Sequence, residues 1–387
     1  MIPIKYNVGN LRSRAVSTLL SVLGIGVVIG VMLAMMALYH GVKLAIVSSG
    51  SKDELLVMRD GAEAELSSWV TKDAYRIIRA LPGIARDSRG ADPLISPEIV
   101  ILFKLPKKDN PKGSNVNVRG VTPKAFEMRP YVKVVEGRMF REGVNEVIVA
   151  RRIRDRFVNA GVGDTFVFGP QQWKVVGVFD AQGTAFDSEI WADAGYLGLA
   201  RKRDSYSSVL VRPADHAAME SIKAAIKNDN RLKLAVKTEY QYYADQTRGL
   251  TGIVVLVSIV TIFMIGGAIL GTMNTMYSAV ASRGREIATL RALGFKRRSI
   301  ILSIVIESAF VALLGGLAGV IFSFPVNWIS TGTTNFQTFS EVAFNFTVDQ
   351  GIALTGMIIA LFAGIVGGSL PAIAAARMPI TKALREI

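Results

Sequence analysis

The sequence has no cysteine, few histidines and little charge for its length, and each shortage excludes a class of protein. None of its 387 residues is a cysteine and only 2 are histidines. Disulfide bonds and thiolate metal sites are therefore excluded. Neither His40 nor His216 has further ligands at a spacing typical of a metal site. Charged residues make up 20% of the chain and hydrophobic residues 50%, a composition that indicates a membrane protein.

The sequence also lacks the motifs of a catalytic or nucleotide-binding site. The dipeptide Gly-Lys never occurs, so there is no phosphate-binding loop of the Gly-x-x-x-x-Gly-Lys-Ser/Thr type. No Ser/His/Asp group or pair of carboxylates stands out beyond what chance gives. We therefore predict no catalytic residues, no directly bound cofactor and no metal, and we expect the chain not to be an enzyme.

Four long apolar segments predict transmembrane helices. A helix needs about 20 mostly apolar residues to cross roughly 30 Å of hydrocarbon. The first segment is too long for the apolar part of a signal peptide, and three more follow it, so we interpret it as a retained anchor. The four segments are Ala15 to Tyr39, Leu250 to Tyr277, Ile300 to Phe324 and Gly351 to Ala376.

Membrane topology explains the excess of basic residues. The net charge is +14, but twelve basic residues flank the membrane segments on one side, and the short loop 325–350 on the other side has none. By the positive-inside rule, both termini and the loop 278–299 face the cytoplasm, and nucleic acid is not expected as a partner. The twelve are Lys5, Arg12, Arg14, Arg283, Arg285, Arg291, Lys296, Arg297, Arg298, Arg377, Lys382 and Arg385.

Residues 40–249 have short apolar runs and frequent turn signals, which predict a large extracytoplasmic α+β domain between the first and second membrane helices. Helix signals mark Thr71 to Leu81, which stops at Pro82, and Ala214 to Lys227, which follows Pro213. The order of helix, strands and helix predicts two interleaved subdomains. The predicted strands are Val116 to Val121, Glu146 to Val149, Thr165 to Phe168 and Trp173 to Phe179.

The loop Ser282 to Arg298 is the most informative stretch. Its residues recur at helical spacing, and a glycine stands where a helix would end. The apolar face of this predicted helix favours a docking role. The alternative is a set of basic residues that only fix topology beside anionic lipid. The residues of the expected docking helix are Arg283, Glu286, Ile287, Leu290, Arg291, Leu293 and Gly294.

Every predicted membrane helix carries a Gly-x-x-x-Gly pair. Small residues let helix backbones approach closely in lipid. Glycine is common in membrane helices, so one pair is weak support, but four pairs favour a compact bundle. The pairs are Gly26 and Gly30, Gly267 and Gly271, Gly315 and Gly319, and Gly364 and Gly368.

One acidic residue, Glu307, lies within the third predicted membrane helix. A carboxylate there costs up to about 3 kcal/mol, so Glu307 should face protein or water. It either forms a conformational latch or substrate contact, or hydrogen-bonds a neighbouring helix as an interfacial residue. We favour a structural or coupling role.

The motifs together resemble the MacB/FtsX-like family of ABC transporter permeases, which are of the type VII, mechanotransmission class. The run from Arg283 to Gly319 (RGREIATLRALGFKRRSIILSIVIESAFVALLGGLAG) resembles the FtsX-like permease core, and Pro371 to Arg385 resembles its closing segment. Asn10 to Gly30 also fits, although it is less basic than usual. Arg119 to Phe126 (RGVTPKAF), Glu136 to Phe140 (EGRMF) and Val175 to Val178 resemble the MacB-type periplasmic core.

The resemblance implies a multi-pass permease of the bacterial cytoplasmic (inner) membrane, with domains 1–39, 40–249 (MacB-like core) and 250–387 (FtsX-like permease). A separate ATPase subunit would bind ATP and magnesium. Further expected partners are a second permease copy, identical or a paralogue, a periplasmic adaptor and an outer-membrane channel. Export or efflux is the leading function. The alternatives are a lipoprotein-releasing permease and a non-transporting scaffold that regulates cell-envelope enzymes.

Overall fold

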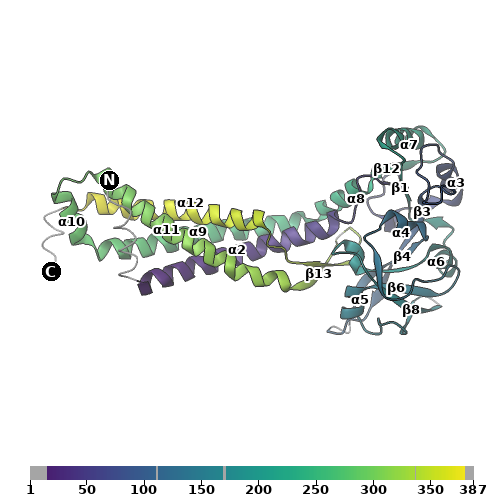
Figure 1. The fold of residues 1–387 in the computed structure, drawn as a ribbon, viewed down its shortest axis with the longest axis horizontal. Helices are drawn as coiled ribbons and strands as arrows, with labels where there is room; N and C mark the ends of the chain where they lie inside the picture. The colour runs from purple at the N-terminus through teal and green to yellow at the C-terminus, as the bar shows by residue number, and fades with distance from the viewer. Residues whose placement is uncertain (1–14, 110–111, 169–170, 336, 380–387) are drawn as a thin grey trace. The chain divides into compact units, whose positions relative to one another are not determined.

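The structure, a computed structural model, describes residues 15–109, 112–168, 171–335 and 337–379. Lys5, Arg12, Arg14, Lys382 and Arg385 of the topology argument lie outside the described residues. The chain divides into two compact units (Figure 1). We call residues 1–40, 252–329 and 346–387 the membrane unit, and residues 41–251 and 330–345 the α/β unit.

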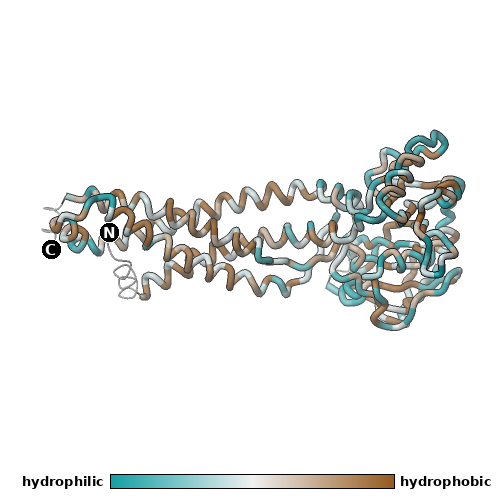
Figure 2. Tube along the Cα trace, turned by 45° about the horizontal axis from the view of Figure 1, so that its top comes forward, coloured by the Kyte–Doolittle hydropathy of each residue, from teal (hydrophilic) through white to brown (hydrophobic). Residues whose placement is uncertain are grey.

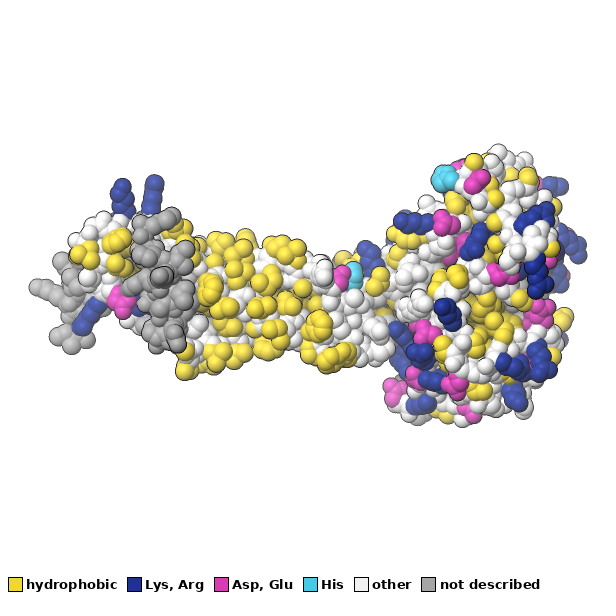
Figure 3. All heavy atoms as spheres, viewed as in Figure 1, with side chains coloured by type: hydrophobic (Ala, Val, Ile, Leu, Met, Phe, Trp, Pro, Cys, Tyr) yellow, Lys and Arg dark blue, Asp and Glu magenta, His cyan; other side chains and the backbone are white. Residues whose placement is uncertain are grey.

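Four long apolar helices confirm the four predicted membrane segments. Figure 2 shows hydrophobic residues along these helices, and Figure 3 shows many hydrophobic side chains on the visible face of their middle part. A short helix α10 (Gly284–Ala292) lies between the second and third of them, and Gly294 after it has a φ of +94°. This left-handed conformation suits glycine and ends the helix, as expected. The long helices are α2 (Ala15–Val47), α9 (Thr251–Ala281), α11 (Arg297–Ser323) and α12 (Gln350–Arg377).

Helices α2 and α11 approach closely at two facing glycine pairs. Gly26 and Gly30 of α2 lie against Gly315 and Gly319 of α11. A Cβ atom added to Gly319 would lie 2.8 Å from Cβ of Ile29 and 2.9 Å from the carbonyl oxygen of Gly26. Only glycine leaves room for this approach, which is how small residues promote helix packing in lipid.

Helix α12 packs against α11 in the same way. A Cβ atom added to Gly364 would lie 2.6 Å from Cβ of Ala312, and one added to Gly368 would collide with Ser308. The hydroxyl of Ser308 donates to the carbonyl oxygen of Gly364 at 2.7 Å. The contact is therefore both tightly packed and hydrogen-bonded.

The fourth glycine pair has different surroundings. A Cβ atom added to Gly267 or Gly271 of α9 would have no described atom of another helix within 4 Å. At these two positions α9 is therefore open rather than packed against another described helix. Large apolar side chains are also exposed on α9, namely Val255, Leu256, Ile259, Ile262, Phe263 and Leu270.

The α/β unit is built on a mixed ten-stranded sheet. Its strand order is β12-β1-β11-β3-β4-β9-β6-β8-β5, with β7 also paired to β8. The four predicted strands are confirmed as parts of β4, β6, β7 and β8. The strands are β1 (Leu55–Arg59), β3 (Ile95–Leu105), β4 (Ser114–Val121), β5 (Lys133–Gly137), β6 (Glu146–Ala150), β7 (Thr165–Phe168), β8 (Gln171–Asp180), β9 (Glu189–Asp193), β11 (Ser208–Val211) and β12 (Leu234–Thr238).

Two predicted helices cover one end of this sheet. In α3 (Lys72–Arg79), the Thr71 side chain caps the helix by accepting from the N–H of Ala74 at 3.2 Å. In α7 (His216–Asn228), Met219, Ile222 and Ile226 are buried against β1 and β11. Both helices thus confirm the predicted helical segments Thr71 to Leu81 and Ala214 to Lys227. The remaining short helices are α4 (Lys124–Met128), α5 (Arg151–Arg156), α6 (Ala194–Ala200) and α8 (Glu239–Gln246), and a short ladder pairs β2 (Val70–Thr71) with β10 (Ser205–Tyr206).

A hairpin between α11 and α12 belongs to the α/β unit, which the sequence did not predict. It consists of β13 (Ser330–Thr334) and β14 (Glu341–Asn345). The buried carboxylate of Glu341 pairs with Lys107 at 2.5 Å and Arg156 at 2.6 Å. The N–H of Ala343 donates to the Ser188 hydroxyl at 2.7 Å. The segment after α11 is therefore part of the α/β core rather than a free loop.

Candidate functional site

The segment around α10 is fixed to the membrane unit by a buried ion pair. Arg283, the residue before α10, donates from Nη1 and Nη2 to the two carboxylate oxygens of Glu307 in α11, at 2.9 and 2.6 Å. The two side chains are 13% and 5% exposed. Such two-point pairing is strong and directional. Glu307 thus faces protein, as the cost of an unpaired carboxylate in a membrane helix requires.

Apolar packing and a backbone contact hold the rest of α10. Ile287 belongs to a buried cluster with residues of α9, α11 and α12, including Val280, Ile304 and Ala372. Arg291 donates from Nη1 to the carbonyl oxygen of Met378, just after α12, at 2.6 Å. Helix α10 is therefore anchored to three membrane helices at once.

The apolar residues of α10 do not share one outward face, which differs from the expectation. Ile287 is 7% exposed and packs inward, whereas Leu293 is 73% exposed. Leu290 is half-buried and lines a narrow groove with Arg283, Glu286 and Glu307. Leu293 is therefore the apolar side chain of this segment that is most available to another protein.

In the α/β unit, Arg119 is the centre of a buried cluster of charges that sequence reasoning missed. It pairs with Glu65 at 2.9 Å, Glu98 at 2.7 Å and Glu189 at 2.8 Å. All four side chains are at most 5% exposed. The glutamates come from separate elements, so no local spacing in the sequence signals the cluster.

The same cluster ties together the chain segments after α2 and before α9. Arg129 pairs with Glu98 at 2.6 Å and with Glu239 at 2.9 Å. Glu239 begins α8, which continues through a 3-10 turn into α9. Its carboxylate accepts from the N–H of Ser51 at 2.9 Å, and Tyr240 N–H donates to the Ser51 carbonyl at 2.9 Å. The chain segment that follows α2 and the one that precedes α9 thus meet at one buried site.

Acidic groups outnumber basic ones at this site. Glu54, just before β1, pairs with Arg212, but its Oε2 atom is buried without a hydrogen-bond partner. Burial and the nearby Glu239 raise the pKa of Glu54 to about 7. Burial likewise raises the pKa of Glu239. Burial would also raise the pKa of Glu98, but Arg129 and Arg119 reverse the effect and lower it.

Within the described residues, no group of three or more His, Cys, Asp or Glu side chains lies in a position to hold a metal ion. The clustered carboxylates described above are arranged around guanidinium groups instead. Their geometry supports ion pairing rather than metal coordination.

Comparison with known proteins assigns both parts of the chain. Residues 18–229, more than half of the chain, match the model of the MacB-like periplasmic core domain. Residues 258–380 match that of the FtsX-like permease C-terminal domain. This chain belongs to the MacB/FtsX-like family of ABC transporter permeases. With its four apolar helices, it is a multi-pass inner-membrane member of that family.

Relatives of this MacB/FtsX-like permease include two macrolide export ATP-binding/permease proteins called MacB. The Hahella chejuensis protein is 25% identical over 97% of this chain and 59% of its own length. The Pasteurella multocida protein is 24% identical over 97% of this chain and 58% of its own length. The chain thus spans about three-fifths of these curated relatives. The periplasmic region of MacB from Actinobacillus actinomycetemcomitans is 13% identical, with a TM-score of 0.38 over 50% of this chain and 92% of that one.

Proposed function

We propose that this chain is a permease subunit that couples ATP hydrolysis by a separate ATPase subunit to movement of the α/β unit, for export or efflux. The observation that carries this proposal is the arrangement of α10. Leu293 is exposed for a partner, while Arg283 and Ile287 bind the same segment firmly to the membrane helices. A partner that binds α10 therefore acts on α9, α11 and α12 together.

The route to the α/β unit follows the chain itself. Helix α9 is continuous with α8, and Glu239 at the start of α8 is held by Arg129 and Ser51 in the buried charge cluster. The hairpin after α11 is held by Glu341. Suppose that the permease has two conformations. ATP can shift the equilibrium between them only if the ATPase binds the two conformations with different affinities. In this proposal, α10 makes the contact with the ATPase whose strength differs between the two conformations.

The proposal assigns the chemistry to the partner. ATP and magnesium bind to the ATPase subunit, and this chain supplies neither a catalytic residue nor a cofactor site. Helix α10 and both termini face the cytoplasm, where the ATPase is found. The basic residues around α10, such as Arg285, Lys296 and Arg298, support this orientation through the positive-inside rule.

A second permease copy is the proposed occupant of the open side of α9. Gly267 and Gly271 there leave space for close approach, and exposed apolar residues surround them. Small residues of this kind favour helix association in lipid. The copy is either identical or a paralogue. A periplasmic adaptor and an outer-membrane channel complete the proposed export assembly. The alternatives to export are lipoprotein release and the regulation of cell-envelope enzymes.

Single cysteines test this proposal directly because the natural chain has none. In membranes that contain the copurifying ATPase, Leu293→Cys should cross-link to that subunit. Leu199→Cys should not, although Leu199 in the α/β unit is 79% exposed. The purified chain alone should not turn over ATP, and the complex should. Equal cross-linking at both positions, or turnover by the chain alone, would contradict the proposal.

A further inference from the structure

Strand β12 (Leu234–Thr238) forms one edge of the ten-stranded sheet. It pairs only with β1 among the described strands, in an antiparallel register that sets Val57 opposite Val236. All five of its residues are half-buried. An edge strand carries backbone groups that a further strand can bind.

The direction of these backbone groups follows from the hydrogen bonds at both ends of the pair. Asp60 N–H donates to the Lys233 carbonyl at 3.1 Å, and Glu239 N–H donates to the Glu54 carbonyl at 2.8 Å. Residues of an antiparallel pair alternate between bonding inward to the partner strand and pointing away from it. The N–H and C=O groups of Leu234 and Val236 therefore point to the free edge.

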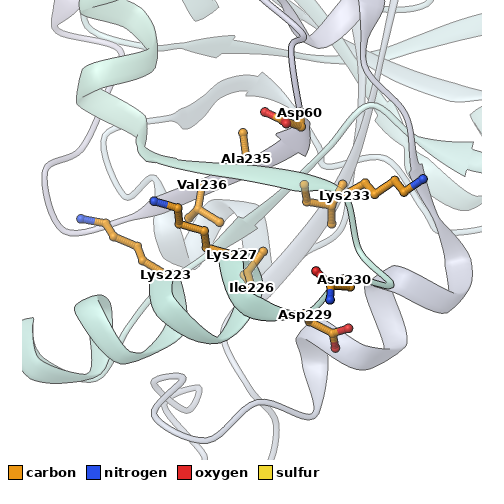
Figure 4. Close-up of a pocket in the computed structure, with 10 residues that line it drawn as sticks. Asp60, Lys223, Ile226, Lys227, Asp229, Asn230, Lys233, Ala235 and Val236 are labelled. Carbon is orange, nitrogen blue, oxygen red and sulfur yellow. The ribbon is translucent and has the colours of Figure 1, made fainter.

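A groove lies alongside this edge, between β12 and α7. Its volume is about 850 Å³, and it is lined by Leu234, Ala235 and Val236 of the strand and by Ile226 and Lys227 of the helix, among others. Figure 4 labels Ala235 and Val236 of the strand and Ile226 and Lys227 of the helix at this groove. A groove between an edge strand and a helix can hold an extended peptide, with main-chain bonds on one side and side-chain contacts on the other.

The charges around the groove favour an acidic occupant. Asp229 is already paired with Arg231 at 2.6 Å, and Lys223 with Glu220 at 2.8 Å. No ion pair within the described part of the chain engages Lys227, Lys233 or Asp60, which also lines the groove, so two ammonium groups stand against one carboxylate. These two ammonium groups are available to carboxylates of a bound segment.

We propose that β12 and α7 bind an extended, acidic peptide segment of a partner protein, which adds to the sheet as a further strand. The lysines supply the charge preference, and the free groups of Leu234 and Val236 supply the main-chain bonds.

Charge repulsion disfavours one register of pairing with a second copy of this chain. In an antiparallel pairing of two β12 strands centred on Ala235, Lys233 of each copy would lie opposite Lys237 of the other. Like charges directly opposite each other in a ladder are destabilising. Charge therefore disfavours the pairing centred on Ala235, whereas a pairing centred on Val236 would set Lys233 opposite Glu239. An acidic segment of another protein meets no such repulsion from Lys227 and Lys233.

The test uses the full chain in lipid nanodiscs and a fluorescent eight-residue peptide of alternating valine and glutamate. We expect saturable binding that weakens with salt, and slower hydrogen exchange at the amides of Leu234 and Val236. A valine–lysine peptide should bind at least tenfold more weakly. Equal binding of both peptides, or unchanged exchange at these amides, would overturn the proposal. So would amide protection that depends on protein concentration without peptide, because it would indicate a second copy at this edge.

Two changes probe the main-chain bonds separately. Val236→Pro removes a donor that points to the free edge, where proline is tolerated in a sheet, and should weaken binding at least tenfold. The matched variant Val236→Ala keeps the donor and should bind within about threefold of the parent. Methylation of alternate peptide nitrogens should weaken binding to the unmodified protein to the same extent. Because methylation changes the peptide and not the protein, its effect cannot come from misfolding of a protein variant. If neither proline nor methylation weakens binding, strand addition is wrong.

Discussion

Arg283 donates two hydrogen bonds to Glu307, at 2.9 and 2.6 Å, and thereby joins the start of α10 to α11 across 24 residues of sequence. The pair explains how a carboxylate is accommodated within an apolar helix. It also fixes the segment that we propose contacts an ATPase.

Replacing Arg283 by alanine should destabilise the membrane unit, because it leaves the buried Glu307 carboxylate without its partner. Breaking a buried pair in this way costs about 3 kcal/mol or more. We expect a lower midpoint of thermal unfolding in nanodiscs, and partial recovery in Arg283→Ala/Glu307→Gln, which removes the charge. Arg298→Ala, at an exposed position, is the control and should unfold like the parent. An unchanged midpoint for Arg283→Ala would show that the pair is not stabilising.

The buried cluster of the α/β unit should make stability depend on pH. The pKa of Glu54 is raised from its ordinary 4.5 to about 7. Between these values the folded chain binds a proton that the unfolded chain has lost, so stability falls as the pH rises through this window. Glu54→Gln cannot ionise and should be more stable than the parent at pH 8, by up to about 3 kcal/mol. At pH 4.5 the two proteins should be alike.

Unfolding midpoints measured from pH 4.5 to 8 would check this prediction. Glu98→Gln is the comparison, because the pKa of Glu98 is lowered and its charge stabilises the fold above its ordinary pKa. That variant should lose stability at pH 8. Parallel pH profiles for the parent and Glu54→Gln would contradict the account of the cluster.

Gly319→Ala should disturb the contact of α2 with α11. Its Cβ atom would lie 2.8 Å from Cβ of Ile29, and overpacking of this kind typically costs about 1–3 kcal/mol. Gly271→Ala places the same atom in open space and should leave the unfolding midpoint unchanged or higher. Equal effects of the two substitutions would mean that the glycine contacts do not determine packing.

Self-association should depend on the open side of α9 instead. Gly267→Leu and Gly271→Leu should leave the unfolding midpoint of the chain close to that of the parent but weaken its dimerisation in lipid, measured by energy transfer between labelled copies. Leu314→Ala, at an exposed position on α11, provides a control. Dimerisation that is unaffected by both leucines would place the second copy elsewhere.

The sequence predicted the parts of this fold that depend on local pattern. Long apolar runs located the four membrane helices, and the helix signals from Thr71 to the stop at Pro82 located α3, because each signal lies within one segment. The hairpin 330–345 escaped prediction, since its place in the α/β unit depends on Glu341 meeting Lys107 and Arg156 from distant segments. The cluster around Arg119 escaped for the same reason.

The sequence predicted the position of helix α10, the proposed coupling segment, but not how its side chains pack. Helical spacing located α10, but it could not show that Ile287 packs inward while Leu293 faces out. That division depends on tertiary packing, because Ile287 belongs to a buried cluster with residues of α9, α11 and α12.

The most direct test of the central claim is ATP turnover by the complex of this chain with its copurifying ATPase, compared for Leu293→Asp and Leu199→Asp. Both substitutions place a charge on an exposed leucine, at 73% and 79% exposure. Only the first lies in the proposed ATPase contact, where a buried charge costs a few kcal/mol. We predict that Leu293→Asp lowers permease-dependent turnover and ATPase copurification at least tenfold, while Leu199→Asp matches the parent. Unchanged turnover and copurification for Leu293→Asp would contradict the claim that α10 couples this permease to an ATPase.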